Sequence, residues 1–124
     1  MSNTYAAKMS TTVTALIIPA RISEPVRVET VEPSLQTLRN LVGGDIETVT
    51  RGDWDVYLNA EGVIANLPPN LRAAQLMCDC GLDLAGVARG TAVFLGHGDH
   101  GEEADAPQHL IGLAEELFFP RLAA

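Results

Sequence analysis

"TALIIPA", residues 14–20, constrains how the rest of this 124-residue chain can fold. Its apolar, β-branched run ends at Pro19 and predicts a buried strand at the centre of a sheet. The next stretch, "VRVETV" at residues 26–31, alternates apolar and charged side chains with the period of a half-exposed strand. Together the two stretches predict a β-hairpin at the start of the fold.

The hydrophobic period then changes from that of a strand to that of a helix. Apolar side chains fall on one helical face at Leu35, Leu38, Leu41 and Val42. Pro33 suits the first turn of this helix, and Gly43 with Gly44 supplies a left-handed end. We therefore predict a helix that packs its leucine face against the sheet.

The remaining elements follow in the order strand, strand, helix, strand, helix. They are predicted at "IETVTRG" (46–52), "WDVYLNAEG" (54–62), "NLRAAQLMCDC" (70–80), "GTAVFLG" (90–96) and a last helix opened by Asp105 and Pro107. Asn70 is the expected N-cap of the second helix. The order β-β-α-β-β-α-β-α predicts an α+β fold, with a mixed or antiparallel sheet of about five strands and two to three helices packed on it.

The length and composition favour one domain. Hydrophobic residues make up 47% of the chain, which is enough for a packed core without disulfides or metals. We expect a flexible leader at residues 1–12, a single α+β domain at 13–120 and a short tail at 121–124.

The net charge of −8 argues against two classes of partner. No basic stripe is present, so neither nucleic acid nor an anionic membrane surface is expected as a ligand. No apolar stretch approaches the roughly 20 residues of a membrane-spanning helix. The acidity is typical of a surface that keeps a protein in solution, and mimicry of DNA by that surface is the less favoured alternative.

Two cysteines, Cys78 and Cys80, lie too close together for an ordinary structural disulfide. This favours a reducing compartment, and hence a cytoplasmic protein. Both thiols are expected to be buried, as free cysteines usually are.

The stretch "LGHGDHGEEADAP", residues 95–107, is the most metal-like part of the sequence. His97, Asp99 and His100 are the residues of an alternative in which the chain is a metal-dependent hydrolase. Cys78 and Cys80 would be the natural co-ligands, but side chains two positions apart on a helix point about 200° apart. We therefore predict a solvated acidic connector, in which Asp105 caps the last helix, and we expect neither a metal nor another cofactor.

The sequence contains none of the short motifs that mark common catalytic sites. It lacks a G-x-S-x-G elbow, an H-E-x-x-H pair and a phosphate-binding loop. No catalytic residue is predicted, and a non-enzymatic role is favoured.

Three segments together resemble the DUF3846 domain family. They are "LVGGDIETV" (41–49), "VYLNAEGVIANLPPN" (56–70) and "GTAVFLG" (90–96), and with the opening strand pair the resemblance covers roughly residues 13–118. It implies a small accessory protein of actinobacteria, their bacteriophages or mobile elements, and it implies no reaction.

Glu47, Asn59 and Asn70 are the polar residues among the family-like positions, and they are the candidates for binding a ligand or a partner. The alternative is structural: asparagine is a common turn former and N-cap. The favoured function is a non-enzymatic module that binds a host protein, and the second choice is a domain that binds a small ligand or nucleotide. Self-association through exposed sheet edges is also expected.

Overall fold

The computed structural model of the protein describes residues 12–82 and 88–118. The strands are β1 (Val13–Ile18), β2 (Arg27–Val31), β3 (Ile46–Arg51), β4 (Trp54–Asn59), β5 (Ala92–His97) and β6 (Glu103–Ala104), and the helices are α2 (Leu35–Val42), α3 (Leu71–Asp79) and α4 (Gln108–Phe118). This order confirms the predicted arrangement and adds the short β6 within the expected connector. The predicted tail at 121–124 and nearly all of the predicted leader lie outside the described residues.

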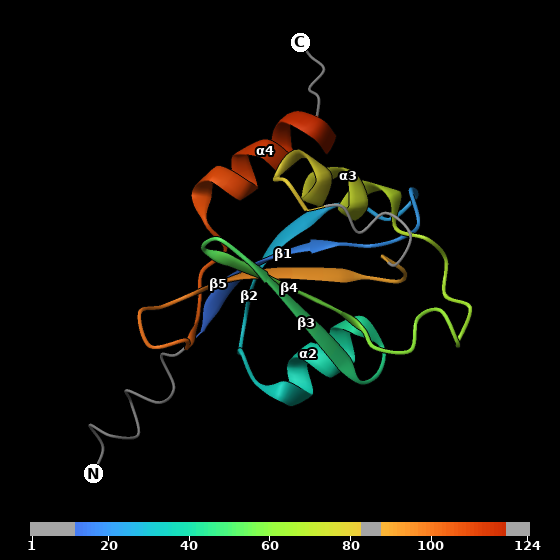
Figure 1. The fold of residues 1–124 in the computed structure, drawn as a ribbon, viewed down its shortest axis with the longest axis horizontal. Helices are drawn as coiled ribbons and strands as arrows, with labels where there is room; N and C mark the ends of the chain where they lie inside the picture. Colours follow the sequence, from blue (N-terminus) through green and yellow to red (C-terminus); the bar gives the residue numbers. More distant parts are fainter. Residues whose placement is uncertain (1–11, 83–87, 119–124) are drawn as a thin grey trace.

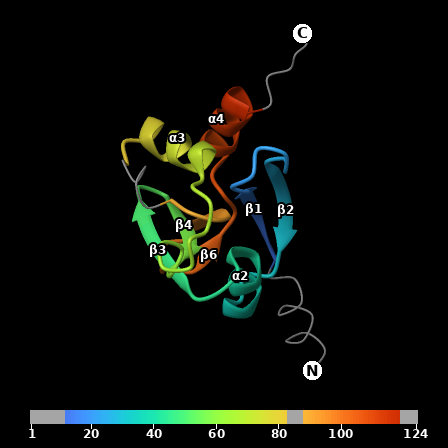
Figure 2. The ribbon, with the colours of Figure 1, turned by 90° about the vertical axis from the view of Figure 1, so that its right-hand side faces the viewer.

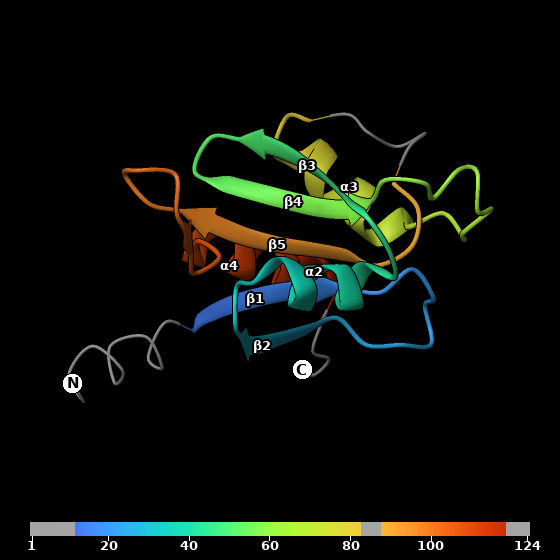
Figure 3. The same ribbon diagram turned by 90° about the horizontal axis from the view of Figure 1, so that it is seen from below.

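The strands form one antiparallel sheet. The order across it is β2-β1-β5-β4-β3, and β6 pairs with the end of β5, as the view in Figure 3 shows for the five longer strands. Every strand pair is antiparallel, so the predicted α+β class is confirmed with an antiparallel sheet. The first hairpin, β1 with β2, also forms as predicted.

Helices cover both faces of the sheet. Figures 1 and 2 show α3 and α4 on one face and α2 on the other. The central strands β1, β4 and β5 are therefore buried on both sides, which is why β1 is continuously apolar instead of alternating. Leu16 and Ile18 pack under α3 and α4, whereas Ala15 and Ile17 pack under α2.

The core consists of two layers on either side of the sheet. The larger lies beneath α3 and α4, and it includes Trp54 and Phe94, whose ring centroids are 5.6 Å apart. The smaller lies beneath α2, around Leu38 and Val42. Within the described residues, no helix is long and apolar enough to cross a bilayer.

The helix ends differ in part from the sequence-based predictions. Helix α2 begins after Ser34, whose Oγ accepts a hydrogen bond from the Thr37 N–H at 3.1 Å, so the expected first turn at Pro33 was wrong. Leu35 consequently lies at the edge of the helix, largely exposed, instead of joining the buried face. The left-handed end at Gly43, with φ of 86°, is confirmed.

Helix α4 begins at Gln108, and Asp105 does not cap it. The Asp105 carboxylate instead accepts a hydrogen bond from the Thr14 N–H at 2.7 Å, and the Ala106 N–H donates to the Thr14 carbonyl at 2.8 Å. These two hydrogen bonds hold the chain after β6 against β1. The prediction that Asp105 caps the last helix was therefore wrong, because its carboxylate bonds to the sheet.

The cysteines also differ from expectation. Cys78 is exposed near the end of α3, and Cys80 is only half-buried, so burial of both thiols was wrong. Burial, followed by the charge of Asp79, raises the pKa of Cys80, which makes this thiol a poor nucleophile.

Candidate functional site

Asn59 lies at the end of β4 and ties together two turns. Its Nδ2 donates to the Val42 carbonyl at 3.2 Å, and its Oδ1 accepts from the Glu61 N–H at 2.8 Å. A Cβ on Gly44 would lie 3.1 Å from the same Nδ2, so a residue without a side chain suits that position. The glycines and asparagine of the family-like motifs thus join the end of α2 to the turn after β4.

Asn70 is buried and caps α3. Its Oδ1 accepts from the Ala73 N–H at 2.9 Å, which confirms the predicted N-cap. Its Nδ2 donates to the carbonyls of Ile18 and Gly90, each at 2.8 Å. The amide therefore connects α3 to the end of β1 and to the segment before β5.

Glu47 is exposed on the edge strand β3, and no hydrogen bond or ion pair among the described residues joins it to Asn59 or Asn70. The side-chain amides of the two asparagines form hydrogen bonds with backbone groups of the same chain. We therefore assign them structural roles, and Glu47 alone keeps a side chain that is open to a partner.

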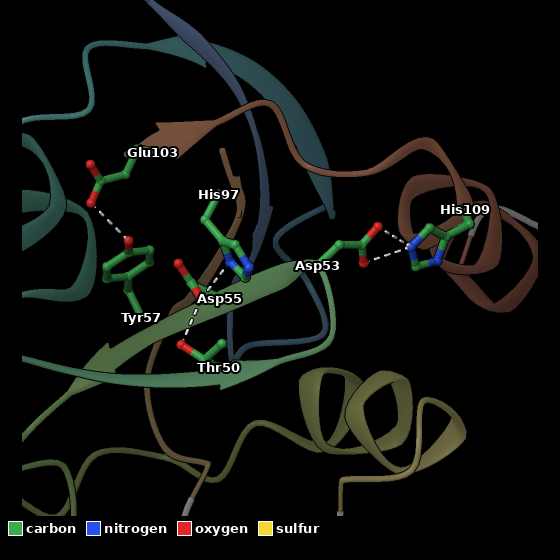
Figure 4. Close-up of polar contacts among 7 residues, drawn as sticks. All are labelled: Thr50, Asp53, Asp55, Tyr57, His97, Glu103 and His109. Carbon is green, nitrogen blue, oxygen red and sulfur yellow. Dashed lines mark hydrogen bonds and ion pairs between the residues drawn. The ribbon is translucent and has the colours of Figure 1, made fainter. Parts of the chain in front are cut away.

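His97 contacts a buried carboxylate on the α2 face of the sheet. Figure 4 shows His97 Nδ1 beside Asp55, where the Nδ1–Oδ1 distance is 3.2 Å. Thr50 Oγ1 donates to the same Oδ1 at 2.7 Å. Asp55 is a buried charge with two partners, as buried charges require, and the contact orients the imidazole.

Tyr57 and Glu103 form a second polar pair beside the first one. The Tyr57 hydroxyl donates to Glu103 Oε2 at 3.1 Å, which fixes β6 to β4 (Figure 4). Burial raises the pKa of the Tyr57 hydroxyl above its ordinary value, and the negative charges of Glu103 and Asp55 add to this effect. The two pairs hold the base of the hairpin between β5 and β6 on β4.

The raised pKa of Tyr57 predicts a loss of stability at alkaline pH. In the unfolded chain this phenol ionises near pH 10, whereas in the native state it stays protonated to a higher pH. The unfolded state therefore binds fewer protons above pH 10, so this contribution to stability is intact below pH 10 and is lost as the pH rises further. Urea unfolding at about pH 9 and about pH 11 should show a steeper loss for the wild type than for Tyr57→Phe. Equal losses of unfolding free energy in the wild type and in Tyr57→Phe would show that Tyr57 does not cause the alkaline destabilisation.

The three residues of the metal alternative are not brought together. His97 turns inward to Asp55, whereas Asp99 and His100 lie in the exposed turn of the hairpin. Across the described ranges, no group of three or more histidine, cysteine or acidic side chains could hold a metal ion. The cysteines proposed as co-ligands lie at the end of α3, as the sequence indicated.

The opposite end of the sheet carries exposed apolar side chains. We call it the loop end, formed by residues 19–26, 43–45, 60–71 and 88–91, where β1 and β4 end and β2, β3 and β5 begin. Figure 3 shows the β1–β2 and β4–α3 connections at this same end of the sheet. Four large apolar residues here are between 62% and 84% exposed: Ile22, Val63, Ile64 and Leu71.

A pocket of about 210 Å³ opens at the loop end. Its apolar walls include Val42 at the end of α2, and Leu67 and Pro68 from the segment before α3. Arg21 and Glu24, from the β1–β2 connection, add one charge of each sign to the wall. The pocket therefore offers an apolar recess with polar groups on one side.

Arg72 holds the β1–β2 connection in place. Its Nη2 lies 2.8 Å from the Pro19 carbonyl, 2.9 Å from that of Arg21 and 2.7 Å from that of Glu24. Burial lowers the pKa of Arg72, and the charge of Glu24 partly opposes this shift. Through these carbonyls, Arg72 holds the backbone that carries both charged residues of the pocket wall.

The sequence-based reasoning missed the loop end. Its signal was the pair Val63 and Ile64, two β-branched residues between the turns at Gly62 and Asn66. This segment is too short and too turn-rich for a strand, and Asn66 adopts a positive φ of 56°. Apolar side chains in such a turn have no core to enter, so their exposure could have been inferred.

The fold places the chain among α+β proteins whose antiparallel sheet carries helices on both faces. The family model described as "Domain of unknown function (DUF3846)" matches residues 13–118, and the chain belongs to this family. The family resemblance predicted from the sequence is thereby confirmed.

A similar arrangement occurs in the crystal structure of the small RNA methyltransferase HEN1, with a TM-score of 0.56 and 17% sequence identity. The similarity covers 92% of this chain but only 18% of that one. At this identity the likeness shows a shared fold and nothing of activity. No functionally curated protein matches the sequence.

Proposed function

We propose that the chain is a non-enzymatic module, encoded by a bacteriophage or mobile element of actinobacteria, that binds a protein in the host cytoplasm. The observation that carries this proposal is the exposure of four large apolar residues in the segments of the loop end, Ile22, Val63, Ile64 and Leu71, at the same end as the pocket. Large apolar side chains left exposed at one end of a domain favour a contact surface for another protein. The phage or mobile-element origin rests on the family resemblance alone.

The size of the pocket favours a protein partner over a free small ligand. Small-molecule sites usually enclose about 300 to 1,000 Å³, and this pocket is smaller. It suits one apolar side chain of a partner, with Ile64 and Leu71 available as further contacts. Interfaces are commonly anchored by such a side chain in a recess, with polar groups at the rim.

The charge of the chain indicates the character of the partner. A net charge of −8 favours a partner with a basic surface around its apolar anchor, because complementary charges speed association and exclude wrong partners. We expect binding to weaken as salt rises, since exposed charges are screened.

A comparative pull-down from actinobacterial host lysate tests the proposal. Wild type should enrich one or a few proteins, and Ile64→Asp should lower that enrichment by about ten-fold or more, because a charge at an apolar contact must be desolvated. Val28→Asp is the matched control, since Val28 is also an exposed, β-branched apolar residue but lies on β2, outside the loop end. The proposal fails if wild type and Ile64→Asp enrich the same proteins to the same extent.

A further inference from the structure

The outer side of β3 is an open sheet edge. β3 is the last strand of the sheet order, and within the described residues no strand pairs with its outer side (Figures 2 and 3). The strand contains no proline and keeps a regular register with β4 along all six residues. Unpaired backbone groups on such an edge are a template for pairing with another chain.

The register of β3 shows which backbone groups point outward. Arg51 and Trp54 flank a two-residue turn, so they form a hydrogen-bonded pair. The Ala60 N–H donates to the Asp45 carbonyl at 2.8 Å, so the pair beyond the other end of the strand is of the same type. Odd-numbered residues therefore bond to β4. The outward groups belong to Ile46, Thr48 and Thr50.

Two opposite charges are placed symmetrically along this edge. Glu47 and Arg51 each lie two residues from Val49, and the three side chains share the face that carries α3 and α4, since Val49 packs against that core. Both charged residues are exposed, and neither forms an ion pair within the part of the chain that the structure describes.

An antiparallel pairing of two β3 strands about Val49 matches these groups. It places Glu47 opposite Arg51 of the second copy, and Arg51 opposite Glu47 of the second copy. It also places Thr48 opposite Thr50, so that their outward N–H and C=O groups form hydrogen-bonded pairs. The charged residues then fall in non-hydrogen-bonded pairs, where cross-strand side chains are closest.

Neighbouring symmetric registers lack this match. Pairing about Thr48 places Glu47 opposite Val49, and pairing about Thr50 places Glu47 opposite Asp53, a like charge. In the remaining kind of register, an even-numbered residue of one strand lies opposite an odd-numbered residue of the other. Outward backbone groups then face inward ones, so the hydrogen bonds between the strands cannot form.

We propose that β3 pairs with β3 of a second copy of this chain, antiparallel and centred on Val49, so that one sheet runs through a two-fold symmetric dimer. The dimer is held by backbone bonds between Thr48 and Thr50 and by the two Glu47–Arg51 ion pairs. A two-fold interface of this kind uses the same patch on both copies. It shares no residue with the loop end, so it stands or falls independently of the proposed function.

The other edge strand, β2, also carries two opposite charges, but they already pair within one copy. The Arg27 Nε and the Glu29 Oε2 are 2.6 Å apart. Antiparallel pairing about Val28 would set Arg27 opposite Glu29 of the second copy, but it would only exchange one exposed ion pair for another, so the charges favour pairing at β2 less than at β3. This edge therefore provides the control.

Sedimentation velocity over a concentration series tests the dimer. Wild type should show a concentration-dependent dimer, and Glu47→Arg or Arg51→Glu alone should raise the dissociation constant by about ten-fold or more, because each sets like charges opposite one another. The double variant Glu47→Arg/Arg51→Glu should restore the dimer. The charge reversal Glu29→Arg, on the other edge strand β2, should leave the dissociation constant of the dimer unchanged. A wild type that stays monomeric at about millimolar concentration, or a double variant no better than the singles, overturns the proposal.

A cross-link provides a second measurement that does not depend on the charged residues. In a Cys78→Ser/Cys80→Ser background, Val49→Cys should form an intermolecular disulfide, since Cα atoms of a non-hydrogen-bonded pair lie about 4.5 Å apart, within disulfide range. Thr30→Cys on β2 is the control and should form far less. Equal cross-linking at the two positions would contradict the β3 dimer.

Discussion

Asn70→Ala is expected to lower the free energy of unfolding by about 3 to 5 kcal/mol, a large part of the stability of a domain this size. The substitution removes the cap of α3, and it leaves the buried carbonyls of Ile18 and Gly90 without their donor. Each buried group left unpaired costs about 1 to 3 kcal/mol, and a lost cap about 1 kcal/mol. Urea denaturation monitored by circular dichroism measures the change.

Two further variants separate the two roles of Asn70, its cap on α3 and its hydrogen bonds to the carbonyls of Ile18 and Gly90. Ser34→Ala removes only the cap of α2, so it should cost about 1 kcal/mol. Asn70→Asp keeps the capping oxygen but sets a carboxylate against two carbonyls, so it should be at least as damaging as Asn70→Ala. If Asn70→Ala cost no more than Ser34→Ala, the bridging role would be wrong.

Arg72→Met is expected to release the β1–β2 connection while the sheet stays folded. Methionine keeps much of the aliphatic stem but not the guanidinium that bonds to the carbonyls of Pro19, Arg21 and Glu24. Amide exchange in residues 19–26 should accelerate by about ten-fold or more, because local opening no longer breaks these bonds. Hydrogen exchange measured by mass spectrometry reads this segment directly.

The same variant should also weaken binding of the protein partner, since a mobile connection must be ordered when the complex forms. Arg27→Met is the matched control, because among the described residues the Arg27 side chain pairs only with Glu29, on the exposed edge strand β2. Exchange in residues 19–26 that is unchanged in Arg72→Met, or equally faster in both variants, would show that Arg72 does not hold the connection.

The sequence-based predictions succeeded where a local pattern has one physical outcome. The apolar run of β1 could be satisfied only by burial on both faces, and Gly43 could end α2 because glycine tolerates a positive φ. Asn70 was predicted as a cap, but its bonds to Ile18 and Gly90 were not, because they join residues that only the folded sheet brings together.

The predictions failed where tertiary contacts compete for a local signal. Asp105 has the sequence signature of a helix cap, but its carboxylate accepts a hydrogen bond from the Thr14 N–H of β1 instead. His97 was predicted to lie in a solvated connector, yet it is the last residue of β5, where strand alternation turns it inward to Asp55. In both cases a strand position determined the partner, and the sequence pattern around the residue did not.

The central claim is that the loop end binds a host protein, and site-specific photo-crosslinking in host cells tests it most directly. A photoreactive amino acid in place of Ile64 should trap one main partner, whereas the same group in place of Val28 should trap it at least about ten-fold less, since contacts in an interface are local. The trapped product at position 64 should also fall in an Arg72→Met background. Equal trapping of that protein at the two positions, or no specific product at position 64, would contradict the account.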